Sequence, residues 1–377
     1  MISSASCFLT MARQIGPQIS GLFMTRSQKP DTLFTPFELV MVMSHYNIGA
    51  ISAVEPFKRG SAASPKIILT TASREYLLKR RAPGKDDLEL LQISHGIQLH
   101  LANQQFPLPH LILTAADNRS WVQLDKSVYE LFEFLPGEAF NYEKPATYNT
   151  GRTLGLFHKL TRDYPMIPEY SERGCYHANR SIDVAFKKIK AIIQADSQLA
   201  TGEKAAAAAA QQAMLQEAYH KAEAKVAAAG LANWPLGIVH ADFHPGNCLY
   251  KGEHVVGVID FDSCRAQQPI LDTANAALQY SIRLGSGDPR SWKENLHAGR
   301  LKAFVSGYES ILQLSEAELH IMPSLMIESM ICEVALGLAS RGQLRGFGPA
   351  AWLESLSAKV AWICEHERPI IQTLDEA

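Results

Sequence analysis

The chain lacks the features that mark several classes of protein. None of its 377 residues lie in a run of 18 or more apolar residues, so a membrane-spanning helix is not expected. Lys and Arg total 36 against 38 Asp and Glu, which gives a net charge of -2. Proteins that bind nucleic acid through its phosphates carry a basic excess. We therefore expect neither a membrane nor a nucleic acid as partner.

The six cysteines are scattered and include no C-x-x-C pair. This pattern favours reduced thiols over a disulfide framework or a zinc site, so we expect a cytoplasmic protein. Apolar residues make up 47% and charged residues 20% of the sequence, as is ordinary for a globular chain. At this length a single hydrophobic core stops growing, which predicts two lobes.

Residues 1–36 are expected to form a variable N-terminal extension. The first thirty residues contain several serines and basic residues and no acid, which is also the composition of an organelle transit peptide. Met11 and Met24 are alternative starts, so we favour an extension or an upstream start codon.

Residues 37–134 are predicted to form a small lobe built on an antiparallel sheet. A Thr35-Pro36 start signal and helical spacing predict a helix over 36–46, and a second helix is predicted over 88–103. The turn dipeptide Pro136-Gly137 follows and suggests the boundary between lobes. Runs rich in β-formers predict strands at 48–57, 66–71, 75–79, 111–114, 121–124 and 129–135.

Residues 135–377 are predicted to form a large, mainly helical lobe. A strand-rich segment followed by a helical one indicates the α+β class rather than alternating βαβ units. The helical patterns cover 147–161, 182–230, 270–284, 296–313, 317–340 and 350–366.

One segment carries the chemistry: His240-Ala-Asp242-Phe-His244-Pro-Gly-Asn247, followed by the apolar strand 255–259 and Asp260. Phosphoryl transfer needs a carboxylate to orient or deprotonate the acceptor hydroxyl, and carboxylate and amide oxygens to hold Mg²⁺. Asp242 and Asn247 are five residues apart, as are the base and the metal-binding asparagine of a kinase catalytic loop. A hairpin turn at 251–254 would return Asp260 to Asn247, so that their oxygens share a metal.

This His-x-Asp-x-x-x-x-Asn motif with Ile-Asp-Phe-Asp resembles the signature of the aminoglycoside and choline kinase-like phosphotransferases, which include type II homoserine kinases. The resemblance implies a bilobal protein-kinase-like fold, with ATP and Mg²⁺ as cofactors. It implies Asp242 as catalytic base, Asn247 and Asp260 as Mg²⁺ ligands, and His240 as a residue that braces the loop. Many relatives have glycine where this chain has Ala241.

The resemblance extends to residues outside the motif. Lys79 matches the strand lysine that pairs with the α- and β-phosphates, although a solvated charge at a strand end is an equal alternative. Relatives place a glutamate on the next helix as the partner of this lysine. Glu89 is our candidate for that partner, because Ser94-His95 occupies the register where an acid is expected.

Further positions complete the implied nucleotide site. Gly60 and Ser61 lie where the family has its phosphate-covering hairpin, although a plain β-turn explains them equally well. The backbone groups of Glu133 and Leu135 match the hinge that binds adenine. His158 and Asp272 also match family positions, and we interpret both as structural, with Asp272 capping a helix or bracing the catalytic loop.

The resemblance implies a small-molecule hydroxyl acceptor, in particular an amino alcohol or amino sugar. Asp262 is the candidate to meet an acceptor ammonium group. Glu328 and Glu333 are further acids, for which a salt bridge or a solvated helix position is favoured.

Two alternatives are a protein serine/threonine kinase of the same fold and a metal-dependent hydrolase that uses His240, Asp242 and His244. A third alternative is a kinase fold without catalysis, although all the key acids are present. The sequence leaves the oligomeric state open.

Overall fold

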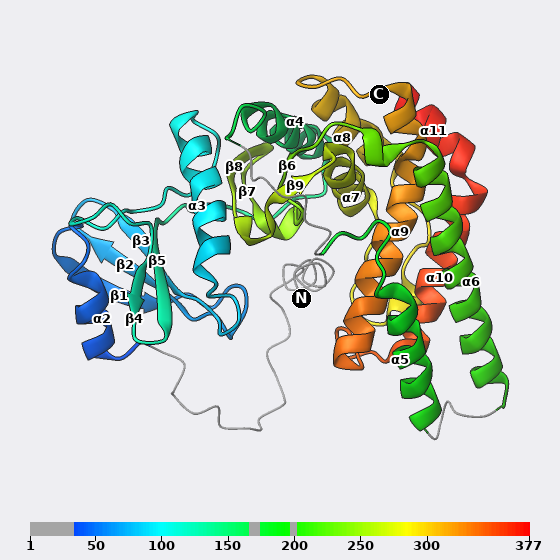
Figure 1. Ribbon diagram of the computed structural model, residues 1–377, viewed down its shortest axis with the longest axis horizontal. Coiled ribbons are helices and arrows are strands. Elements are labelled where there is room, and N and C mark those ends of the chain that lie inside the picture. The colour runs from blue at the N-terminus through cyan, green and yellow to red at the C-terminus, as the bar shows by residue number, and fades with distance from the viewer. Residues whose placement is uncertain (1–33, 166–173, 197–201) are drawn as a thin grey trace. The chain divides into compact units, whose positions relative to one another are not determined.

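A computed structural model describes residues 34–165, 174–196 and 202–377 (Figure 1). Nearly all of the expected N-terminal extension lies outside these residues. The chain divides into two compact units. The strand unit comprises the described residues up to Gly137 together with Val256–Asp262, and the helical unit comprises Glu138–Val255 and Ser263–Ala377. The segment 256–262 thus joins the strand unit from far along the sequence.

The strand unit is built on a five-stranded antiparallel sheet in the order β1-β2-β3-β5-β4. In the middle of this sheet, Lys66 on β2 lies opposite Lys79 on β3, and Lys79 lies opposite Glu130 on β5. The register therefore brings three charged residues side by side across the sheet. The strands are β1 (Ile51–Pro56), β2 (Lys66–Thr71), β3 (Glu75–Arg80), β4 (Val122–Leu124) and β5 (Ser127–Glu133).

Two helices accompany this sheet. Helix α2 (Pro36–Met43) begins at a capping box, in which Thr35 and Glu38 each accept a hydrogen bond from the other's backbone N–H. Helix α3 (Leu88–Asn103) begins at Asp87, whose carboxylate accepts from two backbone N–H groups of the first turn. Buried apolar side chains of α2 and the central strands form the core of the unit.

The strand predicted at 111–114 is wrong. Only Leu111 forms a bridge, with Phe132, and Ile112 donates its N–H to Leu131. Thr114 instead starts a turn, because its N–H donates to the Arg119 carbonyl and its hydroxyl donates to Asp117. A threonine that satisfies its groups locally takes the backbone away from the sheet.

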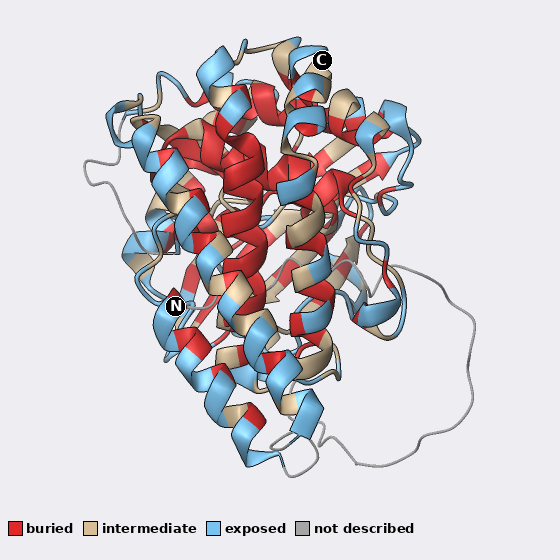
Figure 2. Cartoon of the chain, turned by 90° about the vertical axis from the view of Figure 1, so that its right-hand side faces the viewer, coloured by how far each residue is buried: buried red, intermediate tan, exposed pale blue. Residues whose placement is uncertain are grey.

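Eight helices occupy the described part of the helical unit, and buried residues gather on their inner faces (Figure 2). By length and composition, α9 is the one described helix apolar enough to cross a membrane, but 94% of its most apolar window is buried within the protein. It is a core helix. The set is α4 (Lys144–Leu160), α5 (Ile182–Ala195), α6 (Gly202–Ala228), α7 (Pro269–Ser281), α8 (Ala298–Glu309), α9 (Glu316–Arg341), α10 (Pro349–Glu365) and α11 (Glu367–Asp375).

Helices α4 and α8 pack with their backbones in close contact. A Cβ atom at Gly151 of α4 would overlap the carbonyl group of Phe304, and one at Gly307 of α8 would overlap that of Tyr148. Glycine is therefore required at both positions. This close approach brings the end of α4 against Tyr308 of α8, which matters for the site below.

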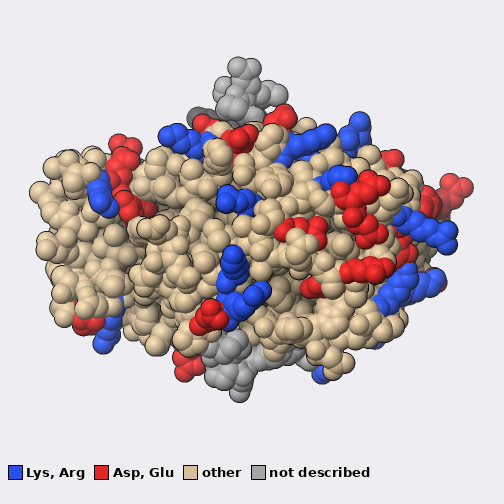
Figure 3. Space-filling model, turned by 90° about the horizontal axis from the view of Figure 1, so that it is seen from above, with Lys and Arg blue, Asp and Glu red and all other residues tan. Residues whose placement is uncertain are grey.

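The predicted motif lies on short strands. Strand β6 (Gly237–Val239) pairs with β9 (Arg265–Gln267), and β7 (Cys248–Lys251) forms a two-stranded sheet with β8 (His254–Val258). Residues 240–247 form the loop between β6 and β7. The expected hairpin is thus present, with Gly252 at φ 61° in its turn. On the face drawn in Figure 3, acidic and basic side chains are interspersed, in agreement with the net charge of -2.

Candidate active site

Asp242 and Asn247 meet in the loop after β6. The side-chain amide of Asn247 donates to the backbone carbonyl of Asp242 at 2.9 Å and to its carboxylate at 3.1 Å. Both residues are buried, with 5% and 6% of their surface exposed. The spacing of five residues has therefore brought together the two groups that the sequence indicated. Because the amide nitrogen of Asn247 faces Asp242, its amide oxygen is left for a ligand such as a metal ion.

The loop is braced by Asp272 in the first turn of α7. Its carboxylate accepts the backbone N–H of His240 at 2.7 Å and that of Ala241 at 3.1 Å. Ala241 has φ 61°, a left-handed conformation that costs an L-residue roughly 1–2 kcal/mol. The two hydrogen bonds hold the chain in this conformation, and they explain why a glycine is also suited to this position.

Asp272 is itself held from behind by His158 of α4. The Nε2 atom of His158 lies 3.3 Å from the Asp272 carboxylate, and its Nδ1 atom lies 3.0 Å from the hydroxyl of Tyr308. Burial raises the pKa of Asp272, but hydrogen bonds from His158 and the loop backbone outweigh it, so the pKa lies below its usual value. The expected bracing thus comes from Asp272, while the ring of His240 packs edge-on against Phe157.

His244 is a neutral imidazole beside the carboxylate of Asp242. Its Nδ1 atom accepts the N–H of Gly246 at 2.9 Å, and burial together with His240 lowers its pKa to about 3. Nε2 therefore carries the proton, and it lies 3.7 Å from Asp242. Among the residues that the structure describes, no three His, Cys, Asp or Glu side chains are grouped to hold a metal ion. The hydrolase interpretation receives no support.

Lys79 lies in a network of buried charges in the strand unit. Its ammonium group is 3.3 Å from Glu130 and 3.9 Å from Asp262. Arg81 contacts the same two carboxylates, each at 2.9 Å. Burial alone would lower the pKa of Lys79, but the two carboxylates raise it above its ordinary value, so the lysine stays charged.

The partner of Lys79 is Glu130, not the predicted Glu89. Glu89 is exposed in the first turn of α3, whereas the sheet register places Glu130 directly opposite Lys79. His95, on the α3 position where an acid was expected, contacts the far side of Glu130 at 2.8 Å. The helix therefore supports the acid instead of supplying it.

Sequence reasoning missed both Arg81 and Glu130. Arg81 follows Lys79 by two residues, so period-two alternation places both side chains on one face of the sheet. Glu130 is a single acid within the apolar run Val128–Phe132, and it is buried. A buried strand acid requires a cation, which was the available signal.

Asp262 and Asp260 lie in the same unit. Asp262, the predicted acceptor-binding residue, has its carboxylate engaged by Arg81 and Lys79, so its role toward an acceptor stays a prediction. Asp260 follows β8 with φ 65° and is exposed. Burial is the largest single influence on the pKa of Lys66 and of Lys79 and acts to lower both, whereas the charge of Asp260 acts to raise them, as expected of a carboxylate near these cations. An exposed carboxylate is a group of the kind that Mg²⁺ binds, so Asp260 as a Mg²⁺ ligand stays a prediction.

The predicted nucleotide loop has a tight turn. Gly60 has φ 88°, and any side chain there would approach the ammonium group of Lys66 at 3.1 Å. Ser61 accepts the N–H of Ala63 at 3.3 Å. Burial and the charge of Lys79 lower the pKa of Lys66 to about 8. The backbone of this turn therefore lies beside the ammonium group of Lys66, an arrangement that suits a phosphate.

The predicted hinge follows β5. The N–H of Glu133 donates to the His110 carbonyl at 2.8 Å, and its carboxylate pairs with Arg74 at 2.8 Å. A nucleotide would therefore meet the carbonyl of Glu133 rather than its N–H. Leu135 lies two residues beyond the end of the strand. Adenine binding by these two residues stays a prediction.

Glu333 in the helical unit is a buried acid that forms no ion pair with any residue the structure describes. Glu333 of α9 is 4% exposed, and both its oxygens accept from the Gln279 amide of α7 at 3.1 Å. Burial and the charge of Asp242 raise the pKa of Glu333 well above its ordinary value. Glu328 differs, because it pairs with His177 at 2.9 Å. The expectation of a solvated or salt-bridged helix residue therefore holds for Glu328 and fails for Glu333.

Comparison with known proteins gives one family match and several relatives. Residues 53–314 match the phosphotransferase enzyme family. A homoserine kinase from Sinorhizobium medicae is 24% identical over 303 residues, covering 78% of this chain and 81% of that protein.

Solved structures agree in fold at low sequence identity. An aminoglycoside phosphotransferase from Alicyclobacillus acidocaldarius has a TM-score of 0.66 at 18% identity, covering 93% of this chain and 98% of its own. A microcompartment-associated aminopropanol kinase has a TM-score of 0.63 at 15% identity, covering 87% of this chain and 96% of its own. An amicoumacin kinase, solved with AMP-PNP and Ca²⁺, has a TM-score of 0.52 at 15% identity, covering 86% of this chain and 89% of its own. The α+β, protein-kinase-like fold is thereby confirmed. Because the family match spans well over half of the sequence and includes the catalytic loop, the chain belongs to the phosphotransferase enzyme family.

Proposed function

The chain is a kinase of small-molecule hydroxyl groups, and we propose that its donor is ATP with Mg²⁺ and its acceptor a small amino alcohol. The observation that carries the acceptor class is Glu333, a buried acid whose pKa responds to Asp242 and which faces no cation among the described residues. The homoserine kinase relative and the aminopropanol kinase neighbour are named for acceptors that carry both an amine and a hydroxyl group.

The residues of each unit fit separate parts of the reaction. In the strand unit, Lys79, kept charged by Glu130, is suited to the phosphates of ATP. The amide oxygen of Asn247 in the helical unit and the exposed carboxylate of Asp260 in the strand unit are each of the kind that would bind Mg²⁺. When bound, Mg²⁺ neutralises charge that develops on the transferred phosphoryl group.

Asp242 is suited to orient the acceptor hydroxyl and accept its proton. Asn247 donates to one of its carboxylate oxygens, and Nε2 of the neutral His244 lies 3.7 Å from the other, beyond hydrogen-bond distance. Asp272 fixes the backbone just before Asp242. Catalysis then comes from positioning and charge neutralisation, so no phosphorylated enzyme is expected.

Glu333 is suited to recognise the acceptor ammonium group. A carboxyl group that is buried beside another acid stays protonated until a cation enters. An ammonium group would supply that cation, and Glu333 would ionise as it binds. A plain alcohol of the same length gains nothing from this exchange, so the site would select amines over their unsubstituted counterparts.

The test is the Mg²⁺-dependent consumption of ATP by the full chain with aminopropanol and, as a matched acceptor, propanol. We expect turnover with the amine that exceeds turnover with the alcohol at least about tenfold, because one hydrogen-bonded charge pair is worth roughly 1.5–3 kcal/mol. Asp242→Asn must abolish turnover while retaining ATP binding. Equal turnover of the two acceptors would refute the amine, and turnover only with a peptide would refute the small-molecule acceptor.

A further inference from the structure

Arginines from three segments of the helical unit lie near one another, and two of them, Arg300 and Arg345, act on Tyr142. Arg283 follows α7, and Arg300 lies in the first turn of α8. The guanidinium of Arg300 lies 5.4 Å from the centre of the Tyr142 ring, and it donates to the carbonyl of Ile282 at 3.2 Å. Because Ile282 directly precedes Arg283, this hydrogen bond fixes Arg300 against the segment that carries Arg283.

Arg345 approaches from the turn after α9. It has φ 53°, and the bridge between Leu344 and Phe347 closes the turn around it. Trp352 of α10 donates its indole N–H to the Leu344 carbonyl at 2.9 Å, which attaches the turn to the core. These contacts fix the backbone from which the Arg345 side chain extends.

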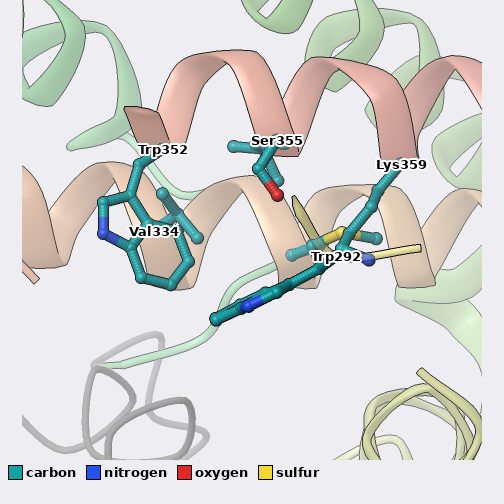
Figure 4. Close-up of a pocket in the computed structure, with 7 residues that line it drawn as sticks. Trp292, Val334, Trp352, Ser355 and Lys359 are labelled. Carbon is teal, nitrogen blue, oxygen red and sulfur yellow. The ribbon is translucent and has the colours of Figure 1, made fainter. Parts of the chain in front are cut away.

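The side chain of Arg345 packs against the ring of Trp292. The guanidinium lies 4.8 Å from the centre of the Trp292 ring, and Trp352 packs edge-on against the same ring at 5.4 Å. Figure 4 shows Trp292 beside Lys359 of α10, with Trp352 at the other end of the small cavity of about 10 Å³ that they line. Lys359 donates to the carbonyl of Arg283 at 3.2 Å, so the same core side chains position Arg283 and Arg345.

The charges of these residues affect one another's pKa, which indicates that the arginines lie near one another. Burial raises the pKa of Tyr142, while the charges of Arg300 and Arg345 both act to lower it. Burial and the charge of Arg283 together lower the pKa of Arg300. Arg300 and Arg345 therefore both lie near Tyr142, and Arg283 lies close enough to Arg300 to repel it.

This cluster lacks its counter-charge. Among the described residues, none of the three arginines forms an ion pair, and each has one buried guanidinium nitrogen without a hydrogen-bond partner. Arg300 is only 6% exposed. Its neighbourhood contains one acid, the exposed Glu143, whose charge favours the cation without contacting it. Arg300 is buried, whereas Arg283 and Arg345 are partly exposed. An unpaired buried cation is costly, so its burial beside two further cations is expected where a ligand completes the site.

We propose that Arg283, Arg300 and Arg345, with the Tyr142 hydroxyl, form a binding site for an anionic group, either a carboxylate or a phosphate. Planar guanidinium groups bind both anions through paired hydrogen bonds. The site uses none of the residues of the catalytic loop and none of the lysines of the strand unit. It does not depend on which acceptor the enzyme phosphorylates.

The test is a titration of the full chain with inorganic phosphate and, separately, with malonate, followed by calorimetry at constant ionic strength set with chloride. ATP at saturating concentration occupies the phosphate-binding lysines of the other unit. We expect saturable binding of at least one anion, weakened at least about tenfold by Arg345→Gln and by Arg283→Gln. Phosphate or malonate as the tighter ligand decides between the two chemistries.

Arg341→Gln is the matched control, because Arg341 is an exposed arginine in the last turn of α9, close in sequence to Arg345. It must leave the affinity unchanged. Binding that chloride abolishes, or that is equal in wild type and both cluster variants, would overturn the proposal. Arg300→Gln is omitted from the first round, because its buried contacts with Ile282 and Tyr142 also support the fold.

Discussion

Replacing Glu333 with glutamine should stabilise the protein while it removes the acceptor's counter-charge. Glu333 is almost fully buried, it accepts hydrogen bonds from the neutral amide of Gln279, and Asp242 adds a second negative charge nearby. Glutamine has the same volume and carries no charge. The amide oxygen of the variant can still accept the hydrogen bond from Gln279.

The size of the effect follows from proton linkage. The folded-state pKa of Glu333 lies well above its ordinary value of 4.5, so between these two pKa values the native state holds a proton that the unfolded state has lost. The free energy of unfolding must therefore fall as the pH rises, by about 1.4 kcal/mol per pH unit for one group. Glu333→Gln lacks this term, so its advantage over wild type should grow steadily above about pH 5.

Urea unfolding followed by tryptophan fluorescence measures this difference, since Trp292 and Trp352 are buried in the helical unit. Wild type and Glu333→Gln are compared at several values between about pH 5 and pH 8. The matched control is Glu316→Gln on the same helix, where 84% of the side chain is exposed. Parallel pH curves for wild type and Glu333→Gln would show that Glu333 is ionised in the native state and would remove the basis for the amine site.

Three further predictions concern the braces of the two units. Ala241→Gly should raise the free energy of unfolding by up to about 1 kcal/mol and leave activity intact, because Ala241 adopts φ 61°; a lower melting temperature would contradict this. Glu130→Gln should cost roughly 3–5 kcal/mol and raise KM for ATP, since Lys79 loses its nearest carboxylate, whereas Glu133→Gln, at an exposed pair, should cost at most about 1 kcal/mol. The contribution of Glu130 to the free energy of unfolding should be present above about pH 4.5 and lost as the pH falls below it, because the pKa of Glu130 is lowered in the folded state. In Glu130→Gln this loss of stability in acid should be absent. Asp272→Asn should lower kcat with little change in KM for ATP, because it loosens the loop at Ala241 without touching the strand unit; an unchanged kcat would show that the brace is dispensable.

Local sequence patterns predicted most helices and strands, because the alternation or helical spacing of apolar residues decides which face of each element can be buried. The strand at Lys66–Thr71 and the helix at Leu88–Asn103 have the bounds that alternation and helical spacing predicted. The one strand that failed, at 111–114, failed because Thr114 closes a turn through contacts with Asp117 and Arg119. Its β-forming composition did not reveal that competition.

The ion pair of Lys79 shows what sequence-based prediction could not reach. Lys79 was identified by its match to the strand lysine of the family, and its partner was assigned to Glu89 because relatives carry the acid on the helix. The sheet register, which depends on the pairing of β3 with β5, places Glu130 there instead. Pairing joins residues about fifty positions apart, and no local pattern encodes it.

The sequence by itself determined the catalytic loop, because Asp242, Asn247 and the residues between them form a contiguous segment whose spacing fixes their geometry. It also determined the α+β class, through the order of strand and helix patterns. Only the tertiary structure decided which charges remain without partners. Glu333 and the arginines around Tyr142 differ from solvated residues only in what packs against them, and burial by distant segments is the physical cause of their unusual energetics.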